Sequence, residues 1–204
     1  MNKTIVILAN SVKHGKHCVA GKCINTKQWI RPVANDLGKE LTKEEASYVN
    51  KYGKYVVKPK QKIEMNLVKQ VSLVNQPENY LIDNNSKWEQ KFKIEDFELE
   101  QYLDYPSTLW GTSSNVPYNE VINNEILIEQ SLYLVKVDNL QLYVNSSNKR
   151  RAKFNYNNIQ YDLPVTDPQF DKIVLNNQEL SGILCLSLGE CFNNNCYKIV
   201  ATIF

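Results

Sequence analysis

The sequence has no apolar run approaching the roughly 20 residues that a membrane-spanning helix needs. Its first residues also lack the long apolar segment and the small-residue cleavage site of a secretory signal, so we expect no membrane partner. The five cysteines are an odd number, which predicts reduced thiols in the cytoplasm rather than a disulfide framework. Glycine-rich phosphate loops are missing as well, because Lys13-His14-Gly15-Lys16 holds too few glycines for one.

Acidic residues are absent from the first part of the chain, where the first one is Asp36. The charged residues before it are all basic, and two histidines lie among them: Lys3, Lys13, His14, Lys16, His17, Lys22, Lys27 and Arg31. Runs rich in Ile and Val predict strands at 4–9, 17–24 and 28–33, with a hairpin turn at 25–27. Cations and an aromatic ring on such strands suit nucleic acid, although a solvated basic face of an ordinary β-domain fits equally.

The chain as a whole is not strongly basic. Its 204 residues have a formal net charge of +2, so a surface for nucleic acid must come from local charge asymmetry. Asp and Glu gather between Glu78 and Asp104, whereas a second basic run lies at Lys149-Arg150-Arg151. With 43% hydrophobic residues, the chain can bury the core of one large domain or of two small ones.

Turn residues between Pro106 and Pro117 divide the chain, and we expect domains at 1–105 and 106–204. In the first, Thr42 and Glu45 form a capping box and Gly53 a stop signal, which predicts a helix between them. Further elements expected there are strands at 55–57 and 62–74, a turn-rich link at 76–83 and a weak helix at 94–103.

The second half predicts three strand pairs and little helix. The pairs are 131–137 with 140–144, 152–156 with 159–163, and 183–188 with 196–204, and a loop is expected at 189–195. Asn157-Asn158 suits a two-residue hairpin turn, and Thr166-Asp167-Pro168 begins a short segment at 169–174. We therefore expect a mainly β protein of two OB-like five-stranded Greek-key barrels with short helical insertions; SH3-like barrels or a single sandwich stay open.

Blocks in a fixed order run from the first predicted strand to the last: 8–11, 13–15, 18–21, 29–33, 76–80, 109–111, 151–154, 161–168, 187–190 and 197–201. In this order they resemble the dual OB-containing domain family of bacteria and archaea. The resemblance implies two fused OB barrels that recognise nucleic acid beside prokaryotic conflict or antiviral defence genes. Two departures are Asn157-Asn158, where the family favours glycine, and the Lys-rich stretch 54–62. That stretch either adds phosphate contacts or is a solvated edge strand blunted by lysine, and we favour the edge strand.

Other chemistry is weakly supported. Cys18 and Cys23 lie an odd number of residues apart on a strand and point to opposite faces, so they do not form a zinc knuckle with His14 and His17. The same groups lack the oxyanion hole and positioned base that a cysteine nucleophile needs. We expect neither a metal site nor a cofactor, and no catalysis.

The candidate contacts with nucleic acid come from both halves. Lys13, His14 and Lys16 follow the first strand, where OB barrels present a ligand-binding loop, and Asn10 and Ser11 end that strand. Trp29 and Arg31 share one face of a strand, so the ring can stack on a base or fill the core while the guanidinium binds phosphate or guanine. The remaining candidates are Lys149, Arg150, Arg151 and Lys198, with Tyr133, Tyr143, Tyr156 and Tyr161 as further rings.

The sequence therefore predicts a non-catalytic nucleic-acid recognition module, binding DNA or RNA, within a bacterial defence system that includes an effector protein. Two alternatives stay open. One is a protein–protein adaptor that uses the acidic stretch 78–104, and the other is a nucleotide-sensing or nucleotide-processing protein with His14, Cys18, Arg31 and Thr166 around a cleft.

Overall fold

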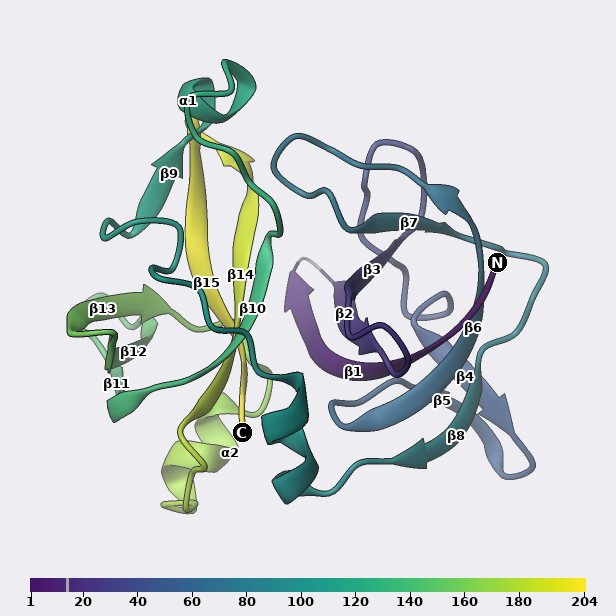
Figure 1. Cartoon of the computed structure of the whole chain (residues 1–204). Coiled ribbons are helices and arrows are strands. Elements are labelled where there is room, and N and C mark those ends of the chain that lie inside the picture. Colours follow the sequence, from purple (N-terminus) through teal and green to yellow (C-terminus); the bar gives the residue numbers. More distant parts are fainter. Residues whose placement is uncertain (14) are drawn as a thin grey trace. The chain divides into compact units, whose positions relative to one another are not determined.

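The computed structural model of the chain describes residues 1–13 and 15–204, and of Lys13 the backbone alone. The chain forms two compact units, which we call unit 1 (Met1–Tyr102) and unit 2 (Leu103–Phe204) (Figure 1). Strands dominate both units, so the mainly β fold class is confirmed.

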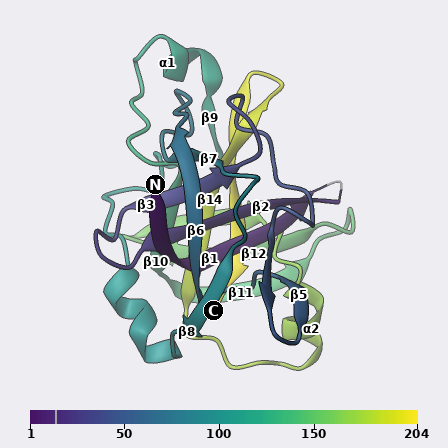
Figure 2. The same ribbon diagram turned by 90° about the vertical axis from the view of Figure 1, so that its right-hand side faces the viewer.

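Unit 1 is a closed five-stranded barrel. Its strands follow the cyclic order β1-β2-β3-β7-β6 and back to β1: β1 (Asn2–Lys13), β2 (Lys16–Cys23), β3 (Trp29–Val33), β7 (Asn79–Ile82) and β6 (Gln61–Gln70). All neighbours are antiparallel except β3 and β7, which pair in parallel from Arg31–Asn79 to Val33–Leu81. Figure 2 shows β1 and β6 crossing one side of the barrel, where Ile5 lies opposite Ile63. This strand order, with one parallel pair, is that of the OB fold.

Closure of this barrel needs a close approach of β1 and β2. Their register shifts by a bulge between Ile7 and Ala9, and Gly21 of β2 lies so near β1 that a Cβ atom there would be 2.1 Å from the Val6 carbonyl oxygen. The interior is filled by apolar side chains such as Ile5, Ile63 and Met65. β7, the strand that completes the barrel, lies within 76–83, which the sequence predicted as a turn-rich link.

The predicted helix after Thr42 is wrong. The capping box itself forms, because Thr42 N donates to Glu45 Oε2 at 2.7 Å and Glu45 N to Thr42 Oγ1 at 3.2 Å. After this single turn the chain enters a hairpin of β4 (Ser47–Asn50) and β5 (Gly53–Val56). The aromatic and β-branched residues Tyr48 and Val49 favour the strand, and Gly53 supplies the positive φ of 139° that the turn requires.

Two further elements complete unit 1. β8 (Glu89–Lys93) adds to the outer edge of β6, and the 3-10 helix η1 (Asp96–Tyr102) ends the unit where a weak helix was expected. Within the described residues β5 pairs only with β4, so the Lys-rich stretch begins on an edge strand as the sequence predicted.

Unit 2 has the same strand order but is only half closed. The four-stranded sheet runs β10-β14-β15-β9, and the three-stranded sheet runs β11-β12-β13. A single parallel bridge, Val165–Val200, connects the two sheets where unit 1 has its parallel strand pair. The bounds are β9 (Asn115–Pro117), β10 (Leu132–Lys136), β11 (Asp138–Val144), β12 (Arg150–Tyr156), β13 (Ile159–Pro164), β14 (Ile183–Phe192) and β15 (Asn195–Ile203), with helices α1 (Tyr118–Ile122) and α2 (Phe170–Leu175).

The predicted hairpin of 131–137 with 140–144 is wrong as well. β10 pairs with β14 and β11 with β12, so the chain passes straight from one sheet into the other at Val137, whose N donates to Gly182 O at 2.8 Å. Asn139, with φ of 55°, produces a bulge in β11 rather than a reversal. β10 and β11 thus act together as the bent first strand of an OB barrel.

The other two hairpins of unit 2 are confirmed. Asn157 (φ 48°) and Asn158 (φ 63°) turn between β12 and β13. Asn193 (φ 49°) and Asn194 (φ 60°) turn between β14 and β15, so those strands continue through the stretch predicted as a loop. The core between the sheets combines Phe154 of β12, Tyr161 of β13 and Phe170 of α2 with residues of the four-stranded sheet such as Leu186 and Val200.

Candidate nucleic-acid interface

Two of the predicted site residues in unit 1 are buried. Trp29 is 5% exposed, and Arg31 forms an ion pair with Glu78 at 3.3 Å while its backbone N donates to the Glu78 carbonyl at 2.9 Å. The indole therefore fills space rather than stacking on a base, and the Arg31 charge belongs to the pairing of β3 with the segment before β7. Neither side chain is placed to bind nucleic acid.

The outward face of the unit 1 barrel is buried where β1, β2 and β3 lie side by side. Val6, Lys22 and Trp29 form a row across β1, β2 and β3, and they are 0%, 3% and 5% exposed. The Lys22 ammonium lies 5.1 Å from the centroid of the Trp29 ring and donates to the Tyr102 carbonyl at 2.7 Å. Strands two and three of an OB barrel are the usual ligand surface, so unit 1 does not present it.

The end of β1 in unit 1 is held by internal hydrogen bonds. Asn10 Nδ2 donates to Val57 O at 2.7 Å, and Asn10 Oδ1 lies 2.8 Å from His17 Nδ1. Since the amide nitrogen is the donor to Val57, the His17 ring donates through Nδ1. Burial and the nearby Lys43 lower the pKa of His17, which favours the neutral ring.

The remaining predicted residues of that region are partly accessible. Ser11 is half-buried and pairs with Cys18, and Lys16 is exposed at the start of β2. His14 and the side chain of Lys13 lie outside the described residues. The sequence therefore predicted a binding site at this end of the barrel, but the side chain of Asn10 is used in hydrogen bonds to Val57 and His17.

Lys198 is fully buried in unit 2. Its ammonium donates to the Gly111 carbonyl at 2.8 Å and lies 5.5 Å from the centroid of the Tyr161 ring. Burial lowers its pKa to about 8. The Tyr161 hydroxyl donates to the same carbonyl at 3.1 Å, so the two side chains hold the Trp110-Gly111 turn and do not face a ligand.

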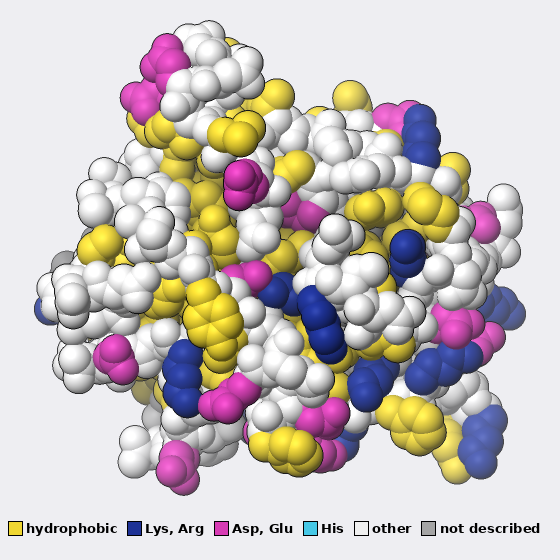
Figure 3. Space-filling model, in the orientation of Figure 1, with side chains coloured by type: hydrophobic (Ala, Val, Ile, Leu, Met, Phe, Trp, Pro, Cys, Tyr) yellow, Lys and Arg dark blue, Asp and Glu magenta, His cyan; other side chains and the backbone are white. Residues whose placement is uncertain are grey.

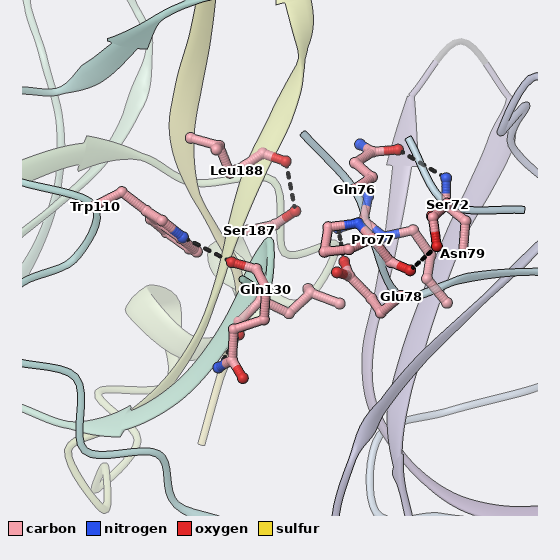
Figure 4. Close-up of polar contacts among 11 residues, drawn as sticks. Ser72, Gln76, Pro77, Glu78, Asn79, Trp110, Gln130, Ser187 and Leu188 are labelled. Carbon is pink, nitrogen blue, oxygen red and sulfur yellow. Dashed lines mark hydrogen bonds and ion pairs between the residues drawn. The ribbon is translucent and has the colours of Figure 1, made fainter. Parts of the chain in front are cut away.

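Trp110, which belongs to the same turn, adds contacts through its side chain. Its indole N donates to the Gln130 carbonyl at 2.8 Å (Figure 4), and its ring lies 4.4 Å from that of Tyr133. Burial raises the pKa of Tyr133 to about 12. The block 109–111 therefore stabilises the fold of unit 2.

The basic run at the start of β12 separates into three directions. Lys149 is exposed on the turn after β11, and Arg150 is ion-paired with Asp171 and lies over the Phe170 ring at 5.7 Å. Arg151 points to the opposite side of the sheet, where Asp162 binds it. Alternation along the strand explains the split, because consecutive side chains face opposite sides.

Arg151 belongs to a solvent-facing surface of the three-stranded sheet. On β12 the residues Ala152, Phe154 and Tyr156 are buried in the core, so their neighbours face outward. β11 and β13 alternate in the same way. We call this surface the polar face; its residues are Gln141, Tyr143, Arg151, Lys153, Asn155, Gln160 and Asp162.

The centre of the polar face is organised by Asp162. Tyr143 Oη donates to Asp162 Oδ2 at 2.6 Å, Arg151 Nε donates to Oδ1 at 3.0 Å, and Arg151 Nη2 donates to the Asp162 carbonyl at 2.6 Å. The bond to Asp162 raises the pKa of the Tyr143 phenol, which stays neutral at physiological pH. Lys153 lies between Gln141 and Asp162 in the register. A ring, two cations and amides are thus held together on the solvent-facing side of the three-stranded sheet.

This arrangement matches what a nucleic acid strand offers. Phosphates attract Arg and Lys, base edges bond to amides and carboxylates, and unpaired bases stack on aromatic rings. Of the four tyrosines noted in the sequence, Tyr156 and Tyr161 are core residues and Tyr133 packs on Trp110, which leaves Tyr143. Lys153, Gln141 and Asn155 were missed, although their alternation with Ala152, Phe154 and Tyr156 is a signal that could have found them.

The two units also differ in charge. Residues 1–102 hold 17 Lys and Arg against 12 Asp and Glu, whereas residues 103–204 hold 7 against 10. Figure 3 shows Lys and Arg side chains gathered over unit 1 on the face drawn. The polar face therefore combines two cations, Arg151 and Lys153, with one carboxylate, Asp162, on the unit that has more acidic than basic residues.

A cavity of about 250 Å³ lies in unit 1 between the β4–β5 hairpin and the segment around Asp83. Its charged lining is Glu44, Glu45, Asp83, Lys54 and Lys87. Because carboxylates outnumber ammonium groups, the cavity does not suit a phosphate.

The loop between β6 and β7, which in OB barrels borders the ligand surface, is closed by its own bonds. Ser72 Oγ donates to Pro77 O at 2.7 Å, and Asn79 Nδ2 donates to Gln76 Oε1 at 3.3 Å (Figure 4). Gln76, Glu78 and Asn79 are buried. These polar groups serve the loop itself rather than a ligand.

The family model described as dual OB-containing domain matches residues 3–203. Among solved structures, the crystal structure of the tetrameric p202 HIN2 is 10% identical and covers 100% of this chain and 93% of its own, with a TM-score of 0.35. The structure of a murine DNA binding protein bound with ds DNA is 8% identical over the same shares, with a TM-score of 0.36. Likenesses this distant do not establish a shared fold. The curated proteins contain no match. Among the described residues, none of the helices has the length and apolar character required to cross a bilayer.

Proposed function

The chain belongs to the dual OB-containing domain family, and from that premise we propose that it binds single-stranded nucleic acid through the polar face of unit 2. The observation that supports this most directly is the solvent-facing, half-buried group of Tyr143, Arg151 and Asp162, with Lys153 beside it. The face covers the first three strands of an OB barrel, and the second and third of these are where such barrels bind oligonucleotides.

A single strand fits the polar face better than a duplex. Stacking on Tyr143 requires a base that is not already paired and stacked, and half-buried side chains on a sheet surface do not reach into a groove. Arg151 binds Asp162 through Nε and Nη2, and these contacts hold its guanidinium on the polar face beside Tyr143, where it is proposed to meet a phosphate or a base edge. The role proposed is recognition without catalysis, so a bound oligonucleotide is expected to be recovered intact.

The test is fluorescence anisotropy of the full chain with labelled single-stranded DNA, single-stranded RNA and duplex DNA. Lys153→Glu is expected to weaken single-strand binding about tenfold and to reduce the slope of log affinity against log salt by roughly one contact. Tyr143→Ser is expected to weaken it by about tenfold through lost stacking. Lys172→Glu, on exposed α2 of the same unit, makes the same change in net charge and is the matched control.

Unchanged binding by both polar-face variants would remove the site from unit 2. Loss with Lys172→Glu equal to that with Lys153→Glu would mean that only bulk charge acts. The wider setting that the family resemblance implied, a bacterial defence system, remains part of the proposal. Its test is whether an effector encoded beside this chain co-purifies with it in a manner that depends on oligonucleotide.

A further inference from the structure

Unit 1 inserts the β4–β5 hairpin between β3 and β6, where unit 2 has helix α2 between β13 and β14. The tip of this hairpin consists of Lys51 and Tyr52, between the paired residues Asn50 and Gly53. Tyr52 is 74% exposed, and the Lys51 ammonium lies 4.9 Å from the centroid of its ring. An aromatic ring and a cation therefore stand together at the end of a two-stranded arm.

The backbone of the hairpin tip is held by hydrogen bonds and by ring packing. Asn50 Oδ1 accepts a hydrogen bond from Tyr52 N at 2.9 Å, and the Tyr55 hydroxyl donates to Tyr52 O at 3.0 Å. The Tyr55 ring in turn packs on buried Tyr48, with centroids 5.9 Å apart. These contacts hold the Tyr52 backbone while its ring remains outside, which lowers the entropy cost of stacking on a ligand.

The charge of the hairpin and the segments that flank it favours a polyanion. Between Thr42 and Lys60 the chain has five lysines against two glutamates, and it belongs to the more basic of the two units. Lys54 is ion-paired with Glu44, whereas Lys43, Lys51 and Lys58 are exposed. A protein partner with an apolar surface would leave these ammonium groups to be desolvated, but a nucleic acid strand supplies phosphates for them and a base for the ring.

We propose that the tip of the β4–β5 hairpin is a second contact for single-stranded nucleic acid, in which an unpaired base stacks on Tyr52 and a phosphate binds Lys51. The class of ligand rests on the proposed function of the polar face, but the site is separate. A strand long enough to occupy both contacts is then bound more tightly than one that fills only the polar face.

The experiment compares variants of the full chain with strands of about 6 and about 30 nucleotides, chosen around the site size of one OB fold. Tyr52→Ser with Lys51→Ser is expected to weaken binding of the long strand about tenfold and of the short strand less than twofold. Phe92→Ser with Lys93→Ser is the matched control, because it removes another exposed ring (76% exposed) and its neighbouring lysine from β8. Urea midpoints of both variants check that the fold is kept.

Photocrosslinking with a 5-bromouridine strand provides the second measurement, and it is expected to label peptides that contain Tyr52 and Tyr143. Labelling at Tyr143 alone, with the Tyr52 variant binding like the Phe92 control, would overturn the hairpin contact and leave the proposed function standing. Labelling at Tyr52 alone would overturn the polar face and support the hairpin. Absence of binding by any strand would overturn both.

Discussion

Each unit has a row of residues across its first three barrel strands, with a lysine in the middle, and the two rows behave in opposite ways. In unit 1 the row is Val6, Lys22 and Trp29, and all three are buried. In unit 2 the row is Gln141, Lys153 and Asp162, and it faces solvent. The same strand order therefore produces an equivalent surface in both units but does not determine whether that surface is buried or faces solvent.

The composition of the two rows explains the difference. Moving valine and tryptophan side chains out of water lowers the free energy, and the lysine between them is satisfied by the Tyr102 carbonyl and the Trp29 ring. Burying glutamine, lysine and aspartate without full hydrogen-bond partners raises the free energy. Unit 1 accordingly uses the OB surface for packing, whereas unit 2 leaves it facing solvent, where we propose that a ligand binds.

The largest expected effect comes from substituting one aromatic residue in each unit. Trp29→Ala is expected to lower the free energy of unfolding by about 4 kcal/mol, because a buried indole is replaced by a cavity. Tyr143→Ala, on an exposed strand, is expected to lower it by about 0.5 kcal/mol and to weaken nucleic acid binding instead. Urea denaturation and anisotropy on both variants measure the two effects. Similar losses of stability in the two variants would contradict the contrast between the faces.

A second test concerns the buried lysine of unit 2. The pKa of Lys198 is lowered by burial to about 8, below its unfolded value of about 10.4. The unfolded chain therefore binds more protons between these values, so stability rises with pH across this window and the cost of burial is fully present below pH 8. Lys198→Met is expected to raise the free energy of unfolding at pH 7 by about 2 kcal/mol, since Tyr161 still donates to Gly111 O.

Urea denaturation of both proteins between pH 7 and 10 gives the readout. The advantage of Lys198→Met should shrink as pH rises, and the tyrosines shared by both proteins cancel in the difference. A constant difference across this range would mean that the Lys198 amine does not titrate near pH 8 in the folded protein.

The smallest expected effect concerns barrel closure. Unit 1 closes through parallel pairing of β3 with β7 and a bond from Arg31 N to Glu78 O at 2.9 Å. Unit 2 closes through the Val165–Val200 bridge and a bond from Thr166 N to Val200 O at 2.9 Å. After correction for intrinsic rates, the Thr166 amide is expected to exchange with solvent about tenfold faster than the Arg31 amide. Equal protection of the two amides in NMR hydrogen exchange would contradict this prediction, because it would show that the two closures are equally stable.

Local patterns predicted much of this fold. The apolar runs of β2 and β3, the Asn157-Asn158 turn and the strands beside it are confirmed, because these signals depend on neighbours in the chain. β7 was missed, because it is short and pairs with β3 and β6, which lie far away in sequence. The Thr42 capping box formed without a helix, because Tyr48 and Val49 found partners across a hairpin.

The candidate site was predicted less well. Charge and aromatic content pointed to Trp29, Arg31 and Lys198, all of which are buried, and to Arg151, which lies on the polar face. The sequence cannot distinguish a lysine that donates to a buried carbonyl from one that faces water, since both kinds alternate with apolar residues. Asp162 was overlooked because its importance comes from Tyr143 and Arg151, which reach it from two other strands.

The sequence by itself determined that this chain is built of strands and tight turns, because side-chain alternation and asparagine or glycine turns act over a few residues. It also determined the family, through the order of its blocks. Only the tertiary structure decided which of two similar barrels presents its outer face. That outcome depends on which side chains meet across strands, and burial is a property of the assembled surface rather than of any single residue.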